Sequence, residues 1–357
     1  MSSINSLNVS LDQCANMIMT AGPAQTILIR GEPGCGKSSL LKRLAAQLPD
    51  YAVSYIDVAN LDLGDIAMPV VDKEEMVTHY APNARFGVTA HSTKPVLVML
   101  DELGKGSRAV LNMLLPLILE HRIGDIPLPT GSIVFATTNL DTDGVNDNIP
   151  AHAYNRMTVV RVAKPSAEQW INWAADNGVS PEVMAFAKQF PQVFDSYTDL
   201  SKHDTNPYIF NPLAGQIKAF TSPRSLAATS VFVANRNTLG DALMPALAGT
   251  VGEAAARDMD AILSLADKLP SFEAIVKAPD TTKIPDNSPA AMFVLAFMLA
   301  GRVESDTLDA VMQYVSRWES FEASTLFIAT LASGKKVAMA CRNRNFTQAA
   351  AKCGRYF

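Results

Sequence analysis

The chain has 357 residues, of which 48% are hydrophobic and 18% charged, a balance that excludes a disordered protein and predicts roughly two or three globular domains. A net charge of −5 gives no overall basic field for nucleic acid or anionic lipid. The cysteines at 14, 35, 341 and 353 lack Cys-x-x-Cys spacing, which disfavours a disulfide framework and favours a reducing compartment. The longest apolar stretch, around residues 290–300, is too short to span a bilayer, so we expect a cytoplasmic protein with no membrane contact.

The first predicted elements are a short helix over residues 9–19, with Ser10 as its N-cap, and an apolar, β-branched strand over residues 26–30. A glycine-rich turn follows the strand, and apolar residues then recur at helical spacing to about residue 47. The turn has the sequence Gly31-Glu32-Pro33-Gly34-Cys35-Gly36-Lys37-Ser38-Ser39. Strand, turn and helix stand in the order required by G-x-x-x-x-G-K-[ST], so we predict a loop that binds a nucleoside triphosphate.

Each residue type in this phosphate loop has a chemical reason. Glycines adopt backbone angles closed to other residues, so successive N–H groups of the loop can surround an anion. The helix that follows directs the positive end of its dipole at the same anion. We expect Lys37 to reach the β- and γ-phosphates and the Ser38 hydroxyl to bind Mg²⁺. The alternative is a chance match in a glycine-rich turn, and the flanking strand and helix argue against it.

A second strand is predicted over residues 53–58, and the pattern over residues 61–94 is irregular, with prolines and a glycine as interruptions. Long irregular loops in compact domains are commonly functional or mobile. We therefore expect residues 61–94 to face a partner or substrate.

The next strand is predicted from the continuous apolar run over residues 96–100, which is typical of a strand buried on both faces of a parallel sheet. It ends in Asp101 and Glu102, and ligands of open α/β folds bind at that end of the strands. We expect Asp101 to hold Mg²⁺ and Glu102 to orient and polarise the water that attacks the γ-phosphate. The alternative is a solvated strand end.

An amphipathic helix is predicted over residues 107–121, followed by a small extended excursion over residues 122–129. A third buried strand begins at residue 132 and ends in Asn139. We expect the Asn139 amide to hydrogen-bond the γ-phosphate or the lytic water. A turn-forming asparagine is the alternative.

A short helix over residues 148–154 leads through Arg156 into a strand over residues 157–162. Arg156 and Arg161 are candidates for a cation offered to the γ-phosphate of a neighbouring subunit, where it neutralises charge that builds up during phosphoryl transfer. The alternative for each is a surface arginine paired with a carboxylate.

From Pro165 the pattern becomes helical, with no second set of alternating strands and helices. Ser222 is a natural N-cap with Pro223 at the first helical position, which places Arg224 at a helix N-terminus. The helix dipole disfavours a cation there, and a bound triphosphate would justify it. An ordinary exposed arginine is the alternative. Further helices are predicted over residues 167–177, 181–190, 251–269, 289–300, 307–322 and 324–334.

The last 23 residues carry six cations and no acid, with aromatic residues between them. A nucleic-acid contact is one interpretation of this basic tail, and docking on an acidic protein surface is the other. The cations are Lys335, Lys336, Arg342, Arg344, Lys352 and Arg355.

With these motifs in order, the sequence resembles the AAA+ ATPases and, within them, the MoxR-like group. The phosphate loop resembles Walker A, and Leu100-Asp101-Glu102 resembles Walker B. Thr138-Asn139 is similar to sensor 1, Asn155-Arg156 to the box that carries the arginine finger, and Ser222-Pro223-Arg224 to sensor 2 of a helical lid. The resemblance covers about residues 8–250.

This resemblance implies an α/β fold in which a parallel sheet flanked by helices is followed by an all-α lid and a C-terminal helical region. The implied domains are residues 1–164, 165–250 and 251–357. It also implies a ring-shaped hexamer with ATP and Mg²⁺ between subunits, and a protein client reached through a von Willebrand factor A domain partner. Residues 122–131 take the place of a β-hairpin before sensor 1, and residues 66–69 that of a pore loop. The usual aromatic residue of a threading pore loop is missing from residues 66–70.

We therefore predict Mg²⁺-dependent ATP hydrolysis that remodels a protein partner. In this prediction Glu102 activates water, Asn139 and Arg224 sense the γ-phosphate within one subunit, and Arg156 acts on the neighbouring site. Two other classes compete with this interpretation. The first is a DNA-acting motor or loader that uses the basic tail, and the second is a scaffold that binds ATP only to assemble.

Overall fold

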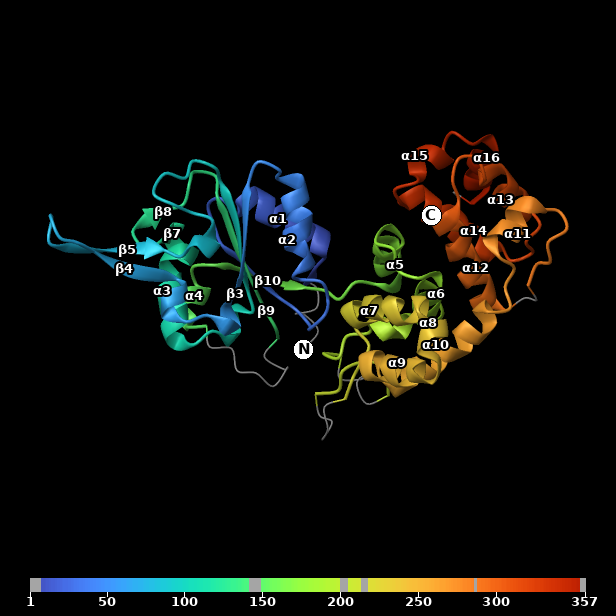
Figure 1. Cartoon of the computed structure of the whole chain (residues 1–357), viewed down its shortest axis with the longest axis horizontal. Coiled ribbons are helices and arrows are strands. Elements are labelled where there is room, and N and C mark those ends of the chain that lie inside the picture. Colours follow the sequence, from blue (N-terminus) through green and yellow to red (C-terminus); the bar gives the residue numbers. More distant parts are fainter. Residues whose placement is uncertain (1–7, 141–148, 200–204, 213–217, 286–287, 354–357) are drawn as a thin grey trace. The chain divides into compact units, whose positions relative to one another are not determined.

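The computed structural model describes residues 8–140, 149–199, 205–212, 218–285 and 288–353 (Figure 1). The chain divides into two compact units, Met1–Lys164 and Pro165–Phe357, at the point where the sequence turns from alternating strands and helices to helices alone. The finer division at residue 250 stays a prediction. None of the helices in the described part of the chain is long and apolar enough to span a membrane.

The first unit is built on a six-stranded sheet in which every pair of neighbouring strands is parallel. This arrangement confirms the predicted α/β class. Across the sheet the strands are β1 (Asn8–Val9), β10 (Thr158–Val162), β2 (Ile27–Arg30), β9 (Ile133–Thr138), β6 (Val96–Asp101) and β3 (Ala52–Asp57). Strand β1 is a correction, because Val9 was expected to begin a helix and instead pairs with Val162.

Helices cover both faces of the sheet. The alternation of side chains along a strand explains this, because Leu97 and Met99 of β6 face one cluster and Val98 and Leu100 face the other. Helices α1 (Leu11–Ala21) and α2 (Ser39–Gln47) pack on the first face, and α3 (Arg108–Glu120) and α4 (Ala151–Tyr154) on the second. Ser10 caps α1 as predicted, and its hydroxyl accepts a hydrogen bond from the Gln13 amide.

The segment predicted to be irregular forms an antiparallel ribbon that projects from the first unit (Figure 1). Its strands are β4 (Ala67–Asp72) and β5 (Val77–Pro82), so the interpretation of residues 61–94 as one long irregular loop was wrong at these two strands. The turn between them is closed by Asp72, whose carboxylate accepts hydrogen bonds from the Glu74 and Glu75 amides. These two backbone hydrogen bonds lower the pKa of Asp72. Short 3₁₀ turns flank the ribbon at Val58–Asn60, Leu63–Asp65 and Ala84–Phe86.

The predicted excursion after α3 is a second, smaller antiparallel pair, β7 (Arg122–Ile123) and β8 (Ile126–Pro127), which confirms an extended structure here. Asp125, in the turn between β7 and β8, holds the ribbon, because it hydrogen-bonds both the backbone N–H and the backbone carbonyl of Tyr80. The Tyr80 amide donates to the Asp125 carboxylate at 2.6 Å, and the Asp125 amide donates to the Tyr80 carbonyl at 3.0 Å. Gly124 (φ +56°) permits this approach, since a Cβ there would lie 2.1 Å from the Tyr80 carbonyl oxygen.

The described part of the second unit is helical, as predicted. Its α-helices are α5 (Ala167–Asp176), α6 (Pro181–Gln189), α7 (Pro223–Ala234), α8 (Arg236–Leu239), α9 (Leu243–Val251), α10 (Glu253–Ala266), α11 (Phe272–Lys277), α12 (Pro289–Arg302), α13 (Leu308–Val315), α14 (Phe321–Ser333), α15 (Val337–Ala340) and α16 (Arg344–Cys353).

Two predicted helices in this unit were wrong in their bounds. The helix expected over residues 251–269 is α10, which begins only at Glu253. Val251 belongs to the preceding helix α9, and Gly252 at φ +89° separates the two helices. The helix expected over residues 307–322 ends at Val315. Two contacts beyond Val315 accompany this end. The Arg317 guanidinium donates to the Thr282 carbonyl at 3.0 Å, and Ser320 is the N-cap of the next helix.

Two hydrophobic clusters hold the second unit together, and helix α12 belongs to both. Phe293 and Phe297 of α12 lie in the first cluster, which extends from α5 through α10. Leu295 and Leu299, on another side of the same helix, lie in the second, which contains α11, α13, α14 and α16. The first cluster therefore runs past residue 250, where the lid was predicted to end.

The basic tail is largely folded. Phe346 of α16 is buried in the second cluster. The Lys335 ammonium donates to the Asp176 carbonyl, and the Lys336 ammonium donates to the carbonyls of Gly301 and Val303, each at 2.7 Å. Two of the six predicted cations are thus used inside the unit. Arg355 lies outside the described residues.

Candidate functional site

The predicted phosphate loop connects β2 to α2, and its glycines have the backbone angles that the motif requires. Gly34 and Gly36 have φ of +73° and +103°, in the left-handed region. Gly31 is required for space, since a Cβ there would lie 2.4 Å from Cγ1 of Val162. Helix α2 begins at Ser39, slightly later than predicted, because residues 36–38 form tight turns whose bonds span three residues.

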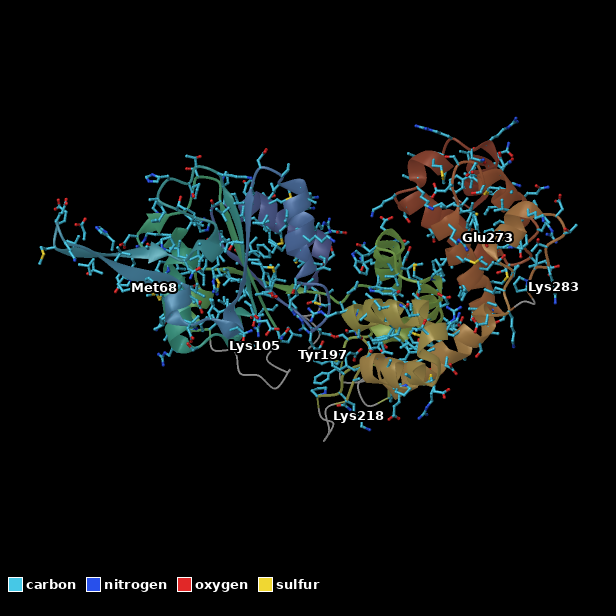
Figure 2. All side chains as sticks on the ribbon, in the orientation of Figure 1. Met68, Lys105, Tyr197, Lys218, Glu273 and Lys283 are labelled. Carbon is cyan, nitrogen blue, oxygen red and sulfur yellow. The ribbon has the colours of Figure 1, made fainter. Side chains whose placement is uncertain are left out.

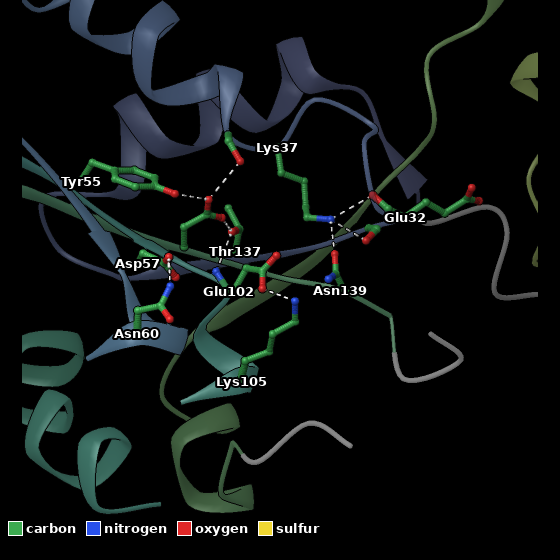
Figure 3. A network of polar contacts seen from close by, with 12 residues as sticks. Glu32, Lys37, Tyr55, Asp57, Asn60, Glu102, Lys105, Thr137 and Asn139 are labelled. Atoms are coloured by element: carbon green, nitrogen blue, oxygen red, sulfur yellow. Dashed lines mark hydrogen bonds and ion pairs between the residues drawn. The ribbon is translucent and has the colours of Figure 1, made fainter. Parts of the chain in front are cut away.

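Lys37 joins two of the predicted motifs. Its buried ammonium donates to the carbonyls of Gly31 and Glu32 at 2.7 and 2.9 Å and to Oδ1 of Asn139 at 2.9 Å (Figure 3). The end of β9 therefore lies against the phosphate loop, as parallel strands with aligned carboxyl ends require. An anion in the loop would lie beside both Lys37 and Asn139.

Asp101, at the end of β6, collects three hydroxyl donors. Ser38 Oγ and the Tyr55 hydroxyl lie 3.0 and 2.9 Å from its Oδ2, and Thr137 donates to its Oδ1. The three donors come from the phosphate loop, β3 and β9, so the carboxylate connects the elements on either side of its strand (Figure 3). Burial and the hydrogen bond to Asp101 raise the pKa of Tyr55 to about 12.

Glu102 follows directly and has an unusual backbone conformation. Its φ of +53° is uncommon for a residue with a side chain, and such strain clusters at functional sites. The Glu102 amide donates to Thr137 Oγ1 at 3.3 Å, and its carboxylate forms an ion pair with Lys105. The Glu102 side chain is 37% exposed, so solvent reaches the carboxylate while Lys105 pairs with it.

Ser38 and Asp101 fit the Mg²⁺ predicted for this site. Their oxygens adjoin, and an all-oxygen pair of one hydroxyl and one carboxylate suits a hard cation. Within the described ranges, no cluster of three or more His, Cys, Asp or Glu side chains is arranged to bind a metal. Mg²⁺ in nucleotide sites typically takes one or two protein carboxylates and fills its remaining positions with phosphate oxygens and water.

Two further predicted site residues, Arg156 and Arg224, are both exposed. Arg156 follows α4 and is exposed, and its carbonyl accepts a hydrogen bond from Gln25 at 2.9 Å. Arg224 is exposed at the N-terminus of α7, where Ser222 caps the helix and Pro223 takes the first position as predicted. It belongs to the second unit, so its role at the γ-phosphate stays a prediction, as does the role of Arg156.

The side chain of Cys35 packs into the hydrophobic core, although the residue lies within the phosphate loop. It is buried in the cluster under α1 and α2, and burial raises the pKa of its thiol. A reactive cysteine needs a lowered pKa, so Cys35 is a packing residue. Its predicted contribution to phosphate binding is limited to the loop backbone.

Three residues of the network were missed from the sequence: Tyr55, Lys105 and Thr137. Tyr55 and Thr137 reach Asp101 because the sheet register pairs Asp57 with Asp101 and Leu100 with Ala136. The local sequence of each strand does not predict how its residues pair with those of a neighbouring strand. The position of Thr137, two residues before the predicted Asn139, was an available signal that it lies at the same edge of the sheet.

Comparison with known proteins gives one family match. Residues 27–163 match the model of the ATPase family associated with various cellular activities (AAA). This segment runs from β2 to just past β10 and contains the phosphate loop, Asp101, Glu102, Asn139 and Arg156. No curated protein matches the sequence.

Among solved structures, NtrX from Brucella abortus in complex with ADP is 13% identical, with 96% of this chain and 68% of that chain covered and a TM-score of 0.40. The RuvB Holliday junction branch migration motor of Thermotoga maritima is 15% identical, with coverage of 87% and 90% and a TM-score of 0.38.

Proposed function

From the match of residues 27–163 to the AAA ATPase family model, we propose that the chain hydrolyses Mg·ATP at sites shared between subunits of a ring-shaped homo-oligomer, with six subunits as the expected number. We further propose that the energy remodels a protein client, as in the MoxR-like group. The observation that carries the proposal is the meeting of Lys37, Asp101 and Asn139 at one edge of the sheet. The predicted cytoplasmic location remains part of the proposal.

In this mechanism each residue acts on a different part of the triphosphate. The loop amides and Lys37 bind the β- and γ-phosphates, while Ser38 and Asp101 hold the metal, which shields phosphate charge when bound. Glu102 accepts a hydrogen bond from the attacking water and polarises it. Asn139 orients the γ-phosphate or that water. Arg224 senses the γ-phosphate in the same subunit, and Arg156 of one subunit completes the site of the next.

The ribbon supports a protein as the partner. Apolar side chains are exposed along both of its strands, and patches of this kind mark interaction sites (Figure 2, where Met68 is labelled). On the strands they are Met68, Val70, Val71, Val77 and Tyr80, and the turn between the strands adds Met76. Tyr80 lies opposite Pro69, so the ribbon does carry an aromatic side chain, on the strand facing the one where it was expected.

A DNA-acting function has weaker support. The ribbon turn holds Asp72, Glu74 and Glu75 against a single Lys73, and three carboxylates repel phosphate. Lys335 and Lys336 of the basic tail are bonded within the second unit. A partner with a von Willebrand factor A domain rests on resemblance alone and stays part of the proposal.

Phosphate release tests the function. We expect wild-type protein to hydrolyse ATP only with Mg²⁺ and to form a larger species with ATP, as measured by sedimentation. Glu102→Gln should bind ATP and lose turnover by a factor on the order of 10² or more, while Glu120→Gln, on an exposed carboxylate at the end of α3, should match wild type. A protein that stays single-chain and releases no phosphate contradicts the proposal.

The client is sought with the Glu102→Gln protein held with ATP. We expect it to retain a protein partner that Met76→Ser protein in the same background retains less well, because Met76 is 84% exposed at the ribbon turn. Equal retention by both proteins would remove the ribbon from the proposal. Stimulation of turnover by nucleic acid would favour the DNA-acting alternative.

A further inference from the structure

Lys105 lies directly beside the carboxylate assigned to water activation. Its ammonium forms an ion pair with Oε2 of Glu102, and the two residues are the ends of one 3₁₀ turn (Figure 3). The Lys105 amide also donates to the Glu102 carbonyl at 2.9 Å. The cation therefore reaches Glu102 through both its side chain and the backbone.

The turn that carries Lys105 is fixed by packing. Leu103 and Gly104, between the two charged residues, are buried. Gly106 lies so close to the 3₁₀ turn after β3 that a Cβ there would stand 2.8 Å from Cγ1 of Val58. Since neither side of the turn can shift freely, the position of the Lys105 backbone is set by the core and not by solvent.

The ion pair engages one carboxylate oxygen. A carboxylate has two oxygens that accept hydrogen bonds, so Oε1 of Glu102 remains available to a water while Oε2 is held. The positive φ of Glu102 ends the extended backbone of β6 directly before this side chain. Orientation of a group that activates water matters, because a displacement of about 1 Å can cost about 10²-fold in rate.

We propose that Lys105 is a positioning residue that fixes Glu102 with Oε1 toward the attacking water. This inference rests on the proposed hydrolytic function and adds to it a residue outside the motifs of the sequence. The competing interpretation is an ordinary surface ion pair, which would contribute little. In this proposal Lys105 acts through Glu102, so its effect should appear in kcat and leave nucleotide affinity unchanged.

The test compares Lys105→Met with Lys105→Arg and with Lys94→Met, a control on an exposed lysine before β6. We expect Lys105→Met to lower kcat by about tenfold to a hundredfold with KM for ATP within about twofold of wild type. Lys105→Arg should restore most of the loss because it keeps the cation. Lys94→Met should behave as wild type.

A double-mutant cycle separates positioning from damage to the fold. In a Glu102→Gln background, Lys105→Met should change residual turnover by less than about twofold, since no carboxylate remains to orient. An equal further loss in that background, an unchanged kcat of Lys105→Met, or faster turnover than wild type would each overturn the inference. Absence of turnover in wild-type protein would instead reject the proposed function, so the two failures are distinguishable.

Discussion

Each unit of the molecule contains a tyrosine that donates a hydrogen bond to an aspartate, and the residues that surround the two pairs differ. In the first unit Tyr55 bonds to Asp101 at 2.9 Å, and in the second Tyr208 bonds to Asp258 at 2.7 Å. The pKa of both tyrosines is raised to about 12, mainly by burial. By this measure alone the two pairs are indistinguishable.

The difference lies in what else converges on the carboxylate. Asp101 receives donors from three elements and stands next to Glu102, at a strand end beside the phosphate loop. Tyr208 packs among Phe186 and Phe190 and ties a loop to α10. A perturbed pKa therefore marks burial in both units, whereas the convergence of three donors on one carboxylate at a strand end distinguishes the candidate site.

The largest expected effect concerns an arginine of the first unit. Arg156→Ala should bind nucleotide and lose turnover by a factor on the order of 10³–10⁵, because in the proposed mechanism the γ-phosphate loses its neutralising cation. Arg257→Ala, in the second unit on an exposed pair with Glu253, should match wild type in phosphate release.

Mixing variants tests whether Arg156 acts across subunits. Neither Arg156→Ala nor Glu102→Gln protein should turn over alone, whereas their mixture should regain part of the activity, because some shared sites then hold an intact pair. Turnover of Arg156→Ala equal to wild type would reject the assignment. A mixture that stays inactive would leave the arginine without a role in trans.

The two aspartates should separate next. Asp101→Asn should lower kcat by about 10²–10³, the scale for one preorganised electrostatic group. Asp258→Asn keeps an acceptor for Tyr208 and should leave phosphate release within about twofold while lowering the free energy of unfolding by about 1 kcal/mol. Equal losses of turnover in both variants would show that the comparison between the units is wrong.

The smallest effect is a pH dependence in the second unit. The pKa of Tyr208 is near 12 when folded and near 10 when unfolded, so the unfolded chain loses the proton first. The stabilisation is fully present below pH 10 and is lost as the pH rises toward 12. In urea unfolding we expect the difference between wild type and Tyr208→Phe, about 1 kcal/mol at pH 8, to shrink above pH 10. A constant difference from pH 8 to 12 would contradict it.

The phosphate loop, the strand ending in Asp101 and Glu102, and Asn139 were predictable because each is stated by a local pattern. The glycine spacing fixes the loop, and a continuous apolar run identifies a buried strand. Five of the six strands of the parallel sheet were predicted, and the exception is β1, whose two residues are too few to show a pattern.

The ribbon and the extra donors were not predictable in the same way. Val70 and Val71 of β4 are both exposed, so the strand lacks the alternation between buried and exposed residues that normally reveals one. Tyr55 and Thr137 reach Asp101 through pairing between strands distant in sequence. The helix end at Val315 depends on Arg317 contacting a loop 35 residues earlier.

Helix α12 limits how the chain can be dissected genetically. Phe293 and Phe297 belong to the first cluster, and Leu295 and Leu299 belong to the second. A stop codon after residue 250 would therefore remove buried side chains from the core of the helices that remain. Removing residues 335–357 would likewise take the buried Phe346 with the basic side chains. Charge reversals at Arg342, Arg344 and Lys352 are the cleaner way to ask what those cations do, because they leave the apolar filling of both clusters intact.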